Sequence, residues 1–279
     1  MLRSVAMDKP VTPLMTPLAQ CPRATLAAIE GVLTDIDETV STQSRLTAEA
    51  YGALAALKAA GLRIIPVTGR PAGWCDHIAR FWPVDAVVGE NGAFWMWQDR
   101  EAGKLRTRFV QGEAERAQGK RRLEAVRREV LREVPGAAIA SDQPFRAADL
   151  AIDFCEDVPA LPHEAVLRIV KIFEAHGAHA KISSIHVNGW FGDYDKLTTS
   201  RLMMAELFGV DLATARGRYV FSGDSPNDAP MFGYFPNAVG VANVRDFADD
   251  MDHLPRWITT ARSGAGFVEL AQALIAARR

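Results

Sequence analysis

The sequence has few cysteines, no excess of basic residues and no long apolar run. Cys21, Cys75 and Cys155 are the only cysteines among 279 residues, which is too few for a disulfide framework or a zinc knuckle and suits a reducing compartment. Lys and Arg number 32 against 34 Asp and Glu, so a nucleic-acid partner is disfavoured. No apolar run is long enough to span a bilayer, and no apolar region follows Arg3 and Lys9 as in a signal peptide.

The remaining composition is that of a globular protein. Hydrophobic residues make up 48% and charged residues 24% of the chain, and the length suits one or two domains with a large core. We therefore expect a cytoplasmic protein, a monomer or homodimer, with no membrane and no nucleic acid as partner. Prolines at 10, 13, 17 and 22 favour a loose N-terminal tail; an irregular arm packed on the body is the alternative.

Short apolar runs then alternate with helical patterns, which favours a parallel sheet covered by helices on both faces. Strands are expected over 31–36, 62–67, 85–89, 218–221 and 238–241. Helices are expected over 47–58, 71–81 and 195–208, from 226 and from about 266. The sequence thus predicts an α/β protein with a Rossmann-like, doubly wound, mostly parallel sheet.

The middle of the chain has a different pattern. Residues 111–134 are charged and helical, and residues 150–155 alternate like a strand with one open face. A helix is expected from Pro162 to about Gly177, followed by strand-like residues to Asn188. This segment is interpreted as a separate α+β unit inserted between two halves of one core.

Acidic residues follow two of the expected strands. Asp35 and Asp37 come directly after the first strand, and Asp224 and Asp228 follow the strand at 218–221. The carboxyl ends of parallel strands share one edge of a sheet, where ligands bind. Carboxylate oxygens suit Mg²⁺, so the acids predict a magnesium site. For a single Asp-x-Asp pair alone, a solvated acidic loop would be the more common reading.

Two further groups suit phosphate at the same edge. Thr68, Gly69 and Arg70 follow a third strand, offering a hydroxyl and backbone N–H groups. Lys196 is expected in the first turn of a helix capped by Asp195. A cation at that position opposes the helix dipole unless an anion lies nearby; an ordinary surface lysine is the alternative.

With these four motifs in this order, the sequence resembles the haloacid-dehalogenase-like (HAD) hydrolase superfamily. The large insertion between the second and third motifs, and residues 89–93 (Gly-Glu-Asn-Gly-Ala), resemble the branch with a large α/β cap, which includes Cof-like and sucrose-phosphatase-like sugar phosphatases. The resemblance implies a tail over 1–29, a catalytic core over 30–97 and 189–279, and an α+β cap over 98–188 that determines substrate specificity. Glu38 departs from the family, which most often has glycine there and so more backbone freedom.

The resemblance also implies a mechanism. Asp35 would be the nucleophile that forms an aspartyl-phosphate, and Asp37 the acid and then the base. Thr68 would hold the phosphoryl group and Lys196 would neutralise its charge. Mg²⁺ would be held by Asp35, Asp224 and the backbone carbonyl of Asp37, with Asp228 in support.

Contacts to the rest of the substrate are less defined. Candidate substrate-binding residues are Thr68, Gly69, Arg70, Asn91, Arg146 and Lys181, although Arg70 could equally pair structurally and Arg146 and Lys181 could be solvated. Asp153 is a further polar candidate in the cap. The aromatic residues at 94–97 and 190–191 favour hinge and core packing over sugar stacking. His176, His179 and His186 are interpreted as surface or packing residues rather than a metal cluster.

The leading hypothesis is a Mg²⁺-dependent phosphatase that acts on a small phosphorylated metabolite, with a sugar phosphate as the favoured class. The nearest alternative is a phosphosugar mutase of the phosphomannomutase type, which would return the phosphoryl group to its substrate. A non-hydrolytic protein that signals through, or binds by, a phosphorylated aspartate is a second alternative. The products would distinguish the three hypotheses: a phosphatase releases phosphate, a mutase forms an isomer, and a signalling or binding protein does neither.

Overall fold

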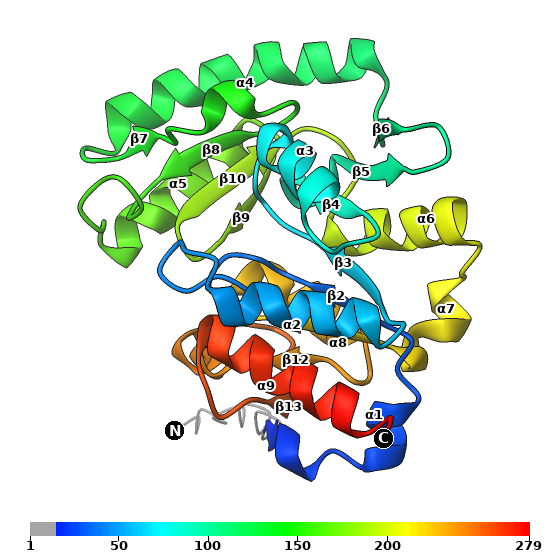
Figure 1. Cartoon of the computed structure of the whole chain (residues 1–279). Coiled ribbons are helices and arrows are strands. Elements are labelled where there is room, and N and C mark those ends of the chain that lie inside the picture. The colour runs from blue at the N-terminus through cyan, green and yellow to red at the C-terminus, as the bar shows by residue number, and fades with distance from the viewer. Residues whose placement is uncertain (1–14) are drawn as a thin grey trace, which may run out of the picture.

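The structure is a computed structural model that describes residues 15–279. Its centre is a parallel sheet in the order β1-β13-β12-β11-β2-β3. The expected α/β fold with a mostly parallel sheet is therefore confirmed (Figure 1). In chain order these strands are β1 (Thr16–Pro17), β2 (Gly31–Thr34), β3 (Arg63–Pro66), β11 (Tyr219–Gly223), β12 (Val239–Gly240) and β13 (Trp257–Ile258).

Alternate residues of the strands fill two separate cores. Val32 and Ile64 belong to one core, whereas Leu33 and Ile65 belong to the other, because successive side chains of a strand point to opposite faces. The first core is covered by α1 (Arg23–Ala27), α2 (Ala48–Ala59), α3 (Ala72–Phe81) and α9 (Ser263–Ala276). The second is covered by α6 (Lys196–Phe208), α7 (Leu212–Ala215) and α8 (Ala229–Tyr234).

The N-terminal segment differs from its prediction where it is described. Residues 16 and 17 form β1 at the edge of the central sheet, α1 contacts α9, and Leu18 and Ile29 are buried in the core. Residues 15–29 are thus an arm packed on the body and not a loose tail, because their apolar side chains cover the sheet. Residues 1–14 of the expected tail lie outside the described residues.

A second, antiparallel sheet joins the core to the insertion. It consists of β4 (Val87–Gly89), β5 (Phe94–Asp99) and β6 (Lys104–Phe109), and a parallel bridge between Val67 and Val88 connects it to β3. The expected boundary after residue 97 falls inside β5. Phe94, Trp95 and Trp190 are buried, so these aromatic residues pack as expected.

The cap is defined here as residues 113–190. It contains a four-stranded antiparallel sheet in the order β7-β8-β10-β9. Two helices, the long α4 (Glu113–Glu133) and α5 (His163–Ala175), pack on the sheet through a core of their own (Figure 1). The strands are β7 (Ala138–Ile139), β8 (Leu150–Asp153), β9 (His179–Ile182) and β10 (His186–Trp190).

Strand β8 does not have the open face predicted for it. All its residues are buried, and Asp153 is 1% exposed. Leu150 and Ile152 contribute to the cap core, while the opposite face includes Asp153, which pairs in register with His186 of β10. Two residues on, Asn188 shares the face of His186. Both line a cavity with Asp35 of the core, so the core covers this face of the cap sheet.

Short helical turns complete the chain. They are η1 (Leu18–Gln20), η2 (Glu90–Gly92), η3 (Gln143–Phe145), η4 (Arg216–Arg218), η5 (Pro226–Asp228) and η6 (Ala242–Asp250). No helix within residues 15–279 is long and apolar enough to cross a membrane. Cys21, Cys75 and Cys155 are free thiols, in agreement with the absence of a disulfide framework.

Candidate active site

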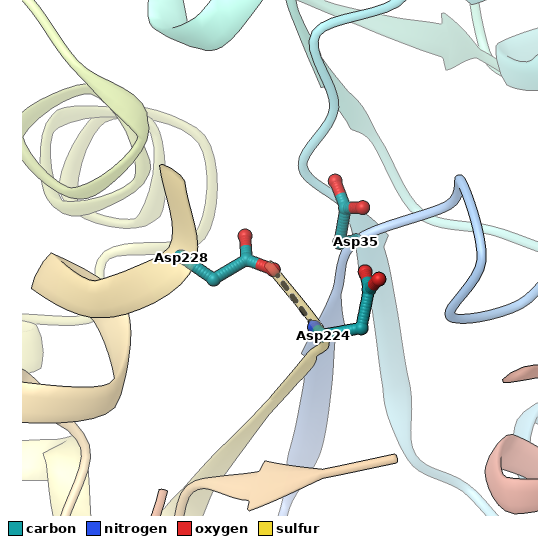
Figure 2. Close-up of side chains that lie close together, drawn as sticks. All are labelled: Asp35, Asp224 and Asp228. Carbon is teal, nitrogen blue, oxygen red and sulfur yellow. Dashed lines mark hydrogen bonds between the residues drawn. The ribbon is translucent and has the colours of Figure 1, made fainter. Parts of the chain in front are cut away.

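Three carboxylates meet where β2 and β11 end. Asp35 follows β2, Asp224 follows β11, and Asp228 closes the turn η5 (Figure 2). Each offers an oxygen within 4.8 Å of the others, and all three residues are buried. The Asp224 N–H donates to Asp228 Oδ2 at 3.0 Å. The strand ends therefore converge as the sequence analysis expected.

Lys196 supplies the positive charge of this cluster. Its Nζ lies 2.7 Å from Asp35 Oδ1 and 2.7 Å from Asp228 Oδ1, and the residue is 4% exposed. Asp195 caps helix α6, its carboxylate accepting from the Thr198 N–H at 2.6 Å. The first turn of α6 thus places Lys196 among the acids, as predicted.

Neutral donors hold Asp224 from the other side. Thr39 Oγ1 donates to Asp224 Oδ1 at 2.9 Å, and Asn243 Nδ2 donates to Asp224 Oδ2 at 3.0 Å. These hydrogen bonds orient the carboxylate but add no charge. The sequence analysis did not single out Thr39 or Asn243.

The cluster has more negative than positive charge. Three carboxylates against one ammonium leave two negative charges in a buried site. Burial raises the pKa of Asp224 well above its usual range, as do the charges of Asp35 and Asp228. Burial also raises the pKa of Asp35, against the lowering effect of Lys196. A divalent cation would balance the two charges, and oxygen donors suit Mg²⁺, so the donor set fits the expected metal.

The predicted phosphate-binding segment lies beside the cluster. Thr68 is fully buried after β3, and its Oγ1 accepts from the Arg70 N–H at 3.0 Å. Gly69 and Arg70 line the same cavity as Asp35.

Arg70 pairs with Asp37. Its Nε donates to both carboxylate oxygens of Asp37, at 2.9 and 3.1 Å, and its side chain is 3% exposed. The resemblance implied that Asp37 acts first as the acid and then as the base. In the structure the guanidinium of Arg70 forms an ion pair with Asp37. This is the structural role that the sequence analysis gave as the alternative for Arg70.

A small cavity separates these residues from the cap. We call it the reaction cavity; it is lined by Asp35, Asp37, Gly69, Arg70, Ser183, Ile185, His186, Asn188 and Asn227. The centre of a water molecule can occupy a volume of about 10 Å³ in this cavity. The cavity therefore has room for about one water. The cap is therefore closed over Asp35 in this structure.

Asn91 lies next to this cavity but does not line it. It is 2% exposed, with φ of 53°, and neither polar atom of its amide has a partner. A Cβ at Gly69 would lie 3.1 Å from Asn91 Nδ2. Asn91 is thus packed against Gly69 of the predicted phosphate-binding segment, with unused hydrogen-bonding capacity.

Arg146, a predicted substrate contact, does not line the reaction cavity. Its guanidinium is fully buried and bonded to Asp142, to Asp149 and to the carbonyl of Gly69. These partners occupy its donors, so it ties the cap to the core instead of facing a substrate.

Lys181, the other predicted substrate contact in the cap, lies outside the reaction cavity. It is exposed on β9 and lines a separate groove with Asp252 and His253. The predicted polar candidate Asp153 holds a turn, because its carboxylate accepts from the N–H groups of Cys155, Glu156 and Asp157.

The three cap histidines do not form a metal site. His176 pairs with Glu129, and His179 lies beside the ring of Trp190. His186 is 2% exposed, lies 2.9 Å from Glu156 Oε2 and lines the reaction cavity. The prediction of packing roles fits these contacts, but sequence reasoning did not find the position of His186 at the cavity.

Sequence reasoning also missed Glu156, Asn188 and Asn227 at the site. The β10 residues could have been found from strand alternation, since His186 and Asn188 share one face. No periodic signal marks Glu156, which lies in the irregular turn after β8.

Glu38, where the resemblance noted from the sequence led us to expect glycine, adopts a left-handed backbone conformation. Its φ is 53°, a region that costs a non-glycine residue about 1–2 kcal/mol. The Ser263 hydroxyl donates to Glu38 Oε2 at 2.9 Å. The Glu38 side chain is thus held by the first residue of α9.

Comparisons with known proteins identify the fold. No family model matches the chain, and no curated protein matches it. Among solved structures, the C-terminal domain of trehalose-6-phosphate phosphatase from C. albicans has a TM-score of 0.68 at 11% identity, covering 91% of this chain and 95% of that one. The sucrose-phosphatase of Synechocystis sp., solved with sucrose and phosphate, has a TM-score of 0.60 at 14% identity, covering 89% and 98%.

A phosphatase of the HAD enzyme superfamily from Bacteroides thetaiotaomicron has a TM-score of 0.59 at 19% identity, covering 93% of this chain and 99% of that one. The chain therefore has the fold of the HAD phosphatases over most of its length, cap included. The fold implied by the sequence resemblance is confirmed.

Proposed function

We propose that this protein is a HAD-type phosphatase that hydrolyses a small phosphorylated metabolite through an aspartyl-phosphate on Asp35. One observation carries the proposal. Asp35, Lys196 and Asp224 come from three distant segments and meet in one buried cluster, next to a cavity that the cap closes. Charge of this kind is costly to bury without a ligand to balance it.

The chain's own residues account for the reaction. The carboxylate of Asp35 attacks phosphorus and the bond from phosphorus to the leaving oxygen breaks. Asp37 lies on the same cavity. In its protonated form it donates a proton to the leaving oxygen. As the carboxylate it then accepts a proton from the water that attacks phosphorus, which breaks the bond to Asp35 and releases phosphate. Lys196 orients Asp35 and offsets the charge of the transferring group, for which the Thr68 hydroxyl and the Gly69 N–H supply hydrogen bonds.

Mg²⁺ is part of this proposal. Asp35 and Asp224 would hold it with the backbone carbonyl of Asp37, and Asp228 would support it. When bound, it would offset negative charge on Asp35 and on the phosphoryl oxygens. The excess of two negative charges in the cluster supports this assignment.

The substrate class is the finer part of the proposal. A sugar phosphate is favoured because structures with this fold and cap include phosphatases of trehalose 6-phosphate and sucrose phosphate. The proposed state is a cytoplasmic monomer or homodimer.

Phosphate release from a panel of sugar, polyol and nucleotide phosphates, with Mg²⁺ or with EDTA, tests the activity. Asp35→Asn should lower turnover by about a thousandfold or more and leave the circular dichroism spectrum unchanged. Near-normal turnover by Asp35→Asn would refute the nucleophile. Isomer formation in place of phosphate release would identify a mutase.

A further inference from the structure

The carboxylate of Glu156 reaches out of the cap and contacts the core arginine that holds Asp37. Arg70 Nη2 lies 2.8 Å from Glu156 Oε1 and 2.8 Å from Asp37 Oδ1. The same guanidinium stacks on the ring of Trp74, 4.3 Å from its centroid. Glu156 and Asp37 are thus joined through one buried cation, although they lie in different parts of the fold.

Contacts within the cap also hold Glu156 in place. Its N–H donates to Asp153 Oδ1 at 2.7 Å, which fixes the turn after β8. Its second oxygen, Oε2, lies 2.9 Å from Nε2 of the buried His186. The interaction with His186, with that of Arg70, lowers the pKa of Glu156 to about 2. The cap therefore presents a fixed, ionised carboxylate to the core.

Another acid of the cap is farther from the guanidinium. Asp142 Oδ2 lies 3.5 Å from Arg70 Nη1, and both oxygens of Asp142 already accept from Arg146. Glu156 is the shorter contact, and its carboxylate has no other arginine partner among the hydrogen bonds and ion pairs of residues 15–279. It is therefore the cap residue best placed to act on Arg70.

We propose that Glu156 is a positioning residue: when the cap closes, it binds Arg70 and so fixes the carboxylate of Asp37 in the reaction cavity. The reaction is then fastest with the cap in place, because Arg70 and Asp37 are fully oriented only when Glu156 is present. The kinetic part of this inference rests on the proposed function. The structural part, the link from Glu156 through Arg70 to Asp37, does not.

Glu156→Gln removes the charge and keeps the size of the side chain. We expect kcat to fall about tenfold, more than KM rises, because the loss affects orientation in the closed enzyme. The matched control is Asp157→Asn, which changes the neighbouring acid. Within residues 15–279 the carboxylate of Asp157 accepts only from the exposed Ser141 hydroxyl. This variant should leave both constants unchanged. Glu156→Asp keeps the charge on a side chain one methylene shorter, so it should also lose the contact with Arg70 and lower kcat.

Hydrogen exchange of the full chain provides a readout that needs no activity. In Glu156→Gln, the amides of residues 37–41 and 154–157 should exchange about tenfold faster than in the wild type and in Asp157→Asn. Unchanged exchange at 37–41, or equal effects of the two variants, would overturn the proposal. If Glu156→Gln does not fold, Glu156→Asp is judged by the same exchange, where faster exchange at 37–41 supports the proposal and wild-type exchange refutes it. Faster exchange in a protein without phosphatase activity would refute only the proposed function.

Discussion

Lys196 and Asp35 are 161 positions apart in the sequence and 2.7 Å apart in the structure. Burial lowers the pKa of Lys196, but the carboxylates of Asp228 and Asp35 outweigh it and the pKa is raised. The ammonium group is thus permanently charged. It is the cation around which the acids at two strand ends are arranged.

Lys196→Met should lower turnover by about a hundredfold or more, since a preorganised charge beside the reacting group contributes about this much. It should also reduce stability, because the carboxylates of Asp35 and Asp228 remain buried without a counter-charge. Phosphate release at saturating Mg²⁺ and a urea unfolding curve measure the two effects.

The control is Lys171→Met, which changes an exposed lysine of helix α5. It should leave turnover unchanged and alter stability by less than about 0.5 kcal/mol. Substantial activity in Lys196→Met would show that Lys196 has a structural role alone.

Asp224→Asn should have opposite effects on stability with and without Mg²⁺. Burial and the neighbouring acids raise the pKa of Asp224, so its ionised form destabilises the metal-free fold at neutral pH. Without metal, the variant should be more stable than the wild type. With Mg²⁺, the wild type should gain stability by mass action and the variant should gain much less.

Thermal melts at pH 7.5 with EDTA or MgCl₂ measure this crossover. NaCl at equal ionic strength corrects for screening, and Asp252→Asn, an exposed acid, is the control variant. Equal stabilisation of wild type and Asp224→Asn by MgCl₂ would place the metal elsewhere.

The acid cluster could be predicted because its signals are local. Asp35 and Asp224 each follow an apolar run, and the ends of parallel strands meet at one edge. Lys196 could be recognised because Asp195, the residue before it, has the side chain of a helix N-cap. The positions of β1 and β13 in the central sheet could not be predicted, because each strand has only two residues and so shows no alternation.

The cap side of the site could not be predicted in the same way. Glu156 lies 86 positions from its partner Arg70, in a turn without alternation, so no pattern connects the two. Arg146 looks like a surface residue in the sequence, because a charged side chain is rarely fully buried unless it is paired. Its partners Asp142 and Asp149 flank an irregular turn, and only the folded chain brings all three together.

Gly92→Ala should disturb the active site from a distance. Gly92 has φ of 113°, and a Cβ there would lie 2.2 Å from the carbonyl oxygen of Asp195. Asp195 caps helix α6 and precedes Lys196, so the start of the helix must move. We expect a loss of about 2 kcal/mol or more in stability and a fall in kcat as the ammonium of Lys196 shifts.

Gly52→Ala is the matched control for this substitution. Gly52 lies in helix α2 with negative φ, and a Cβ there would meet nothing within 4 Å. It should be neutral or stabilise by about 0.5–1 kcal/mol and keep full activity. The same response from both alanine variants would contradict a close contact between Gly92 and the start of α6.

Glu90→Gln should weaken the attachment of the cap in a pH-dependent way. Glu90 is fully buried and accepts from the N–H groups of Ala72, Ala147, Ala148 and Asp149, at 2.6–3.1 Å. An amide in place of the carboxylate turns one oxygen into a donor that faces other donors. The cost is about 1–3 kcal/mol, and exchange at residues 147–149 should accelerate.

The pH dependence of this cost follows from the pKa of Glu90. Burial and then the charge of Asp149 raise it to about 7, above the value of about 4.3 in the unfolded chain. Between these two values the folded wild type binds more protons than the unfolded chain, so its stability falls as pH rises. The glutamine variant has no such contribution. In urea unfolding, the free energy of unfolding of the wild type should therefore exceed that of Glu90→Gln most near pH 5 and less at pH 8. The exposed Glu101→Gln should match the wild type at both pH values, and a difference for Glu90→Gln that grows from pH 5 to pH 8 would contradict the raised pKa.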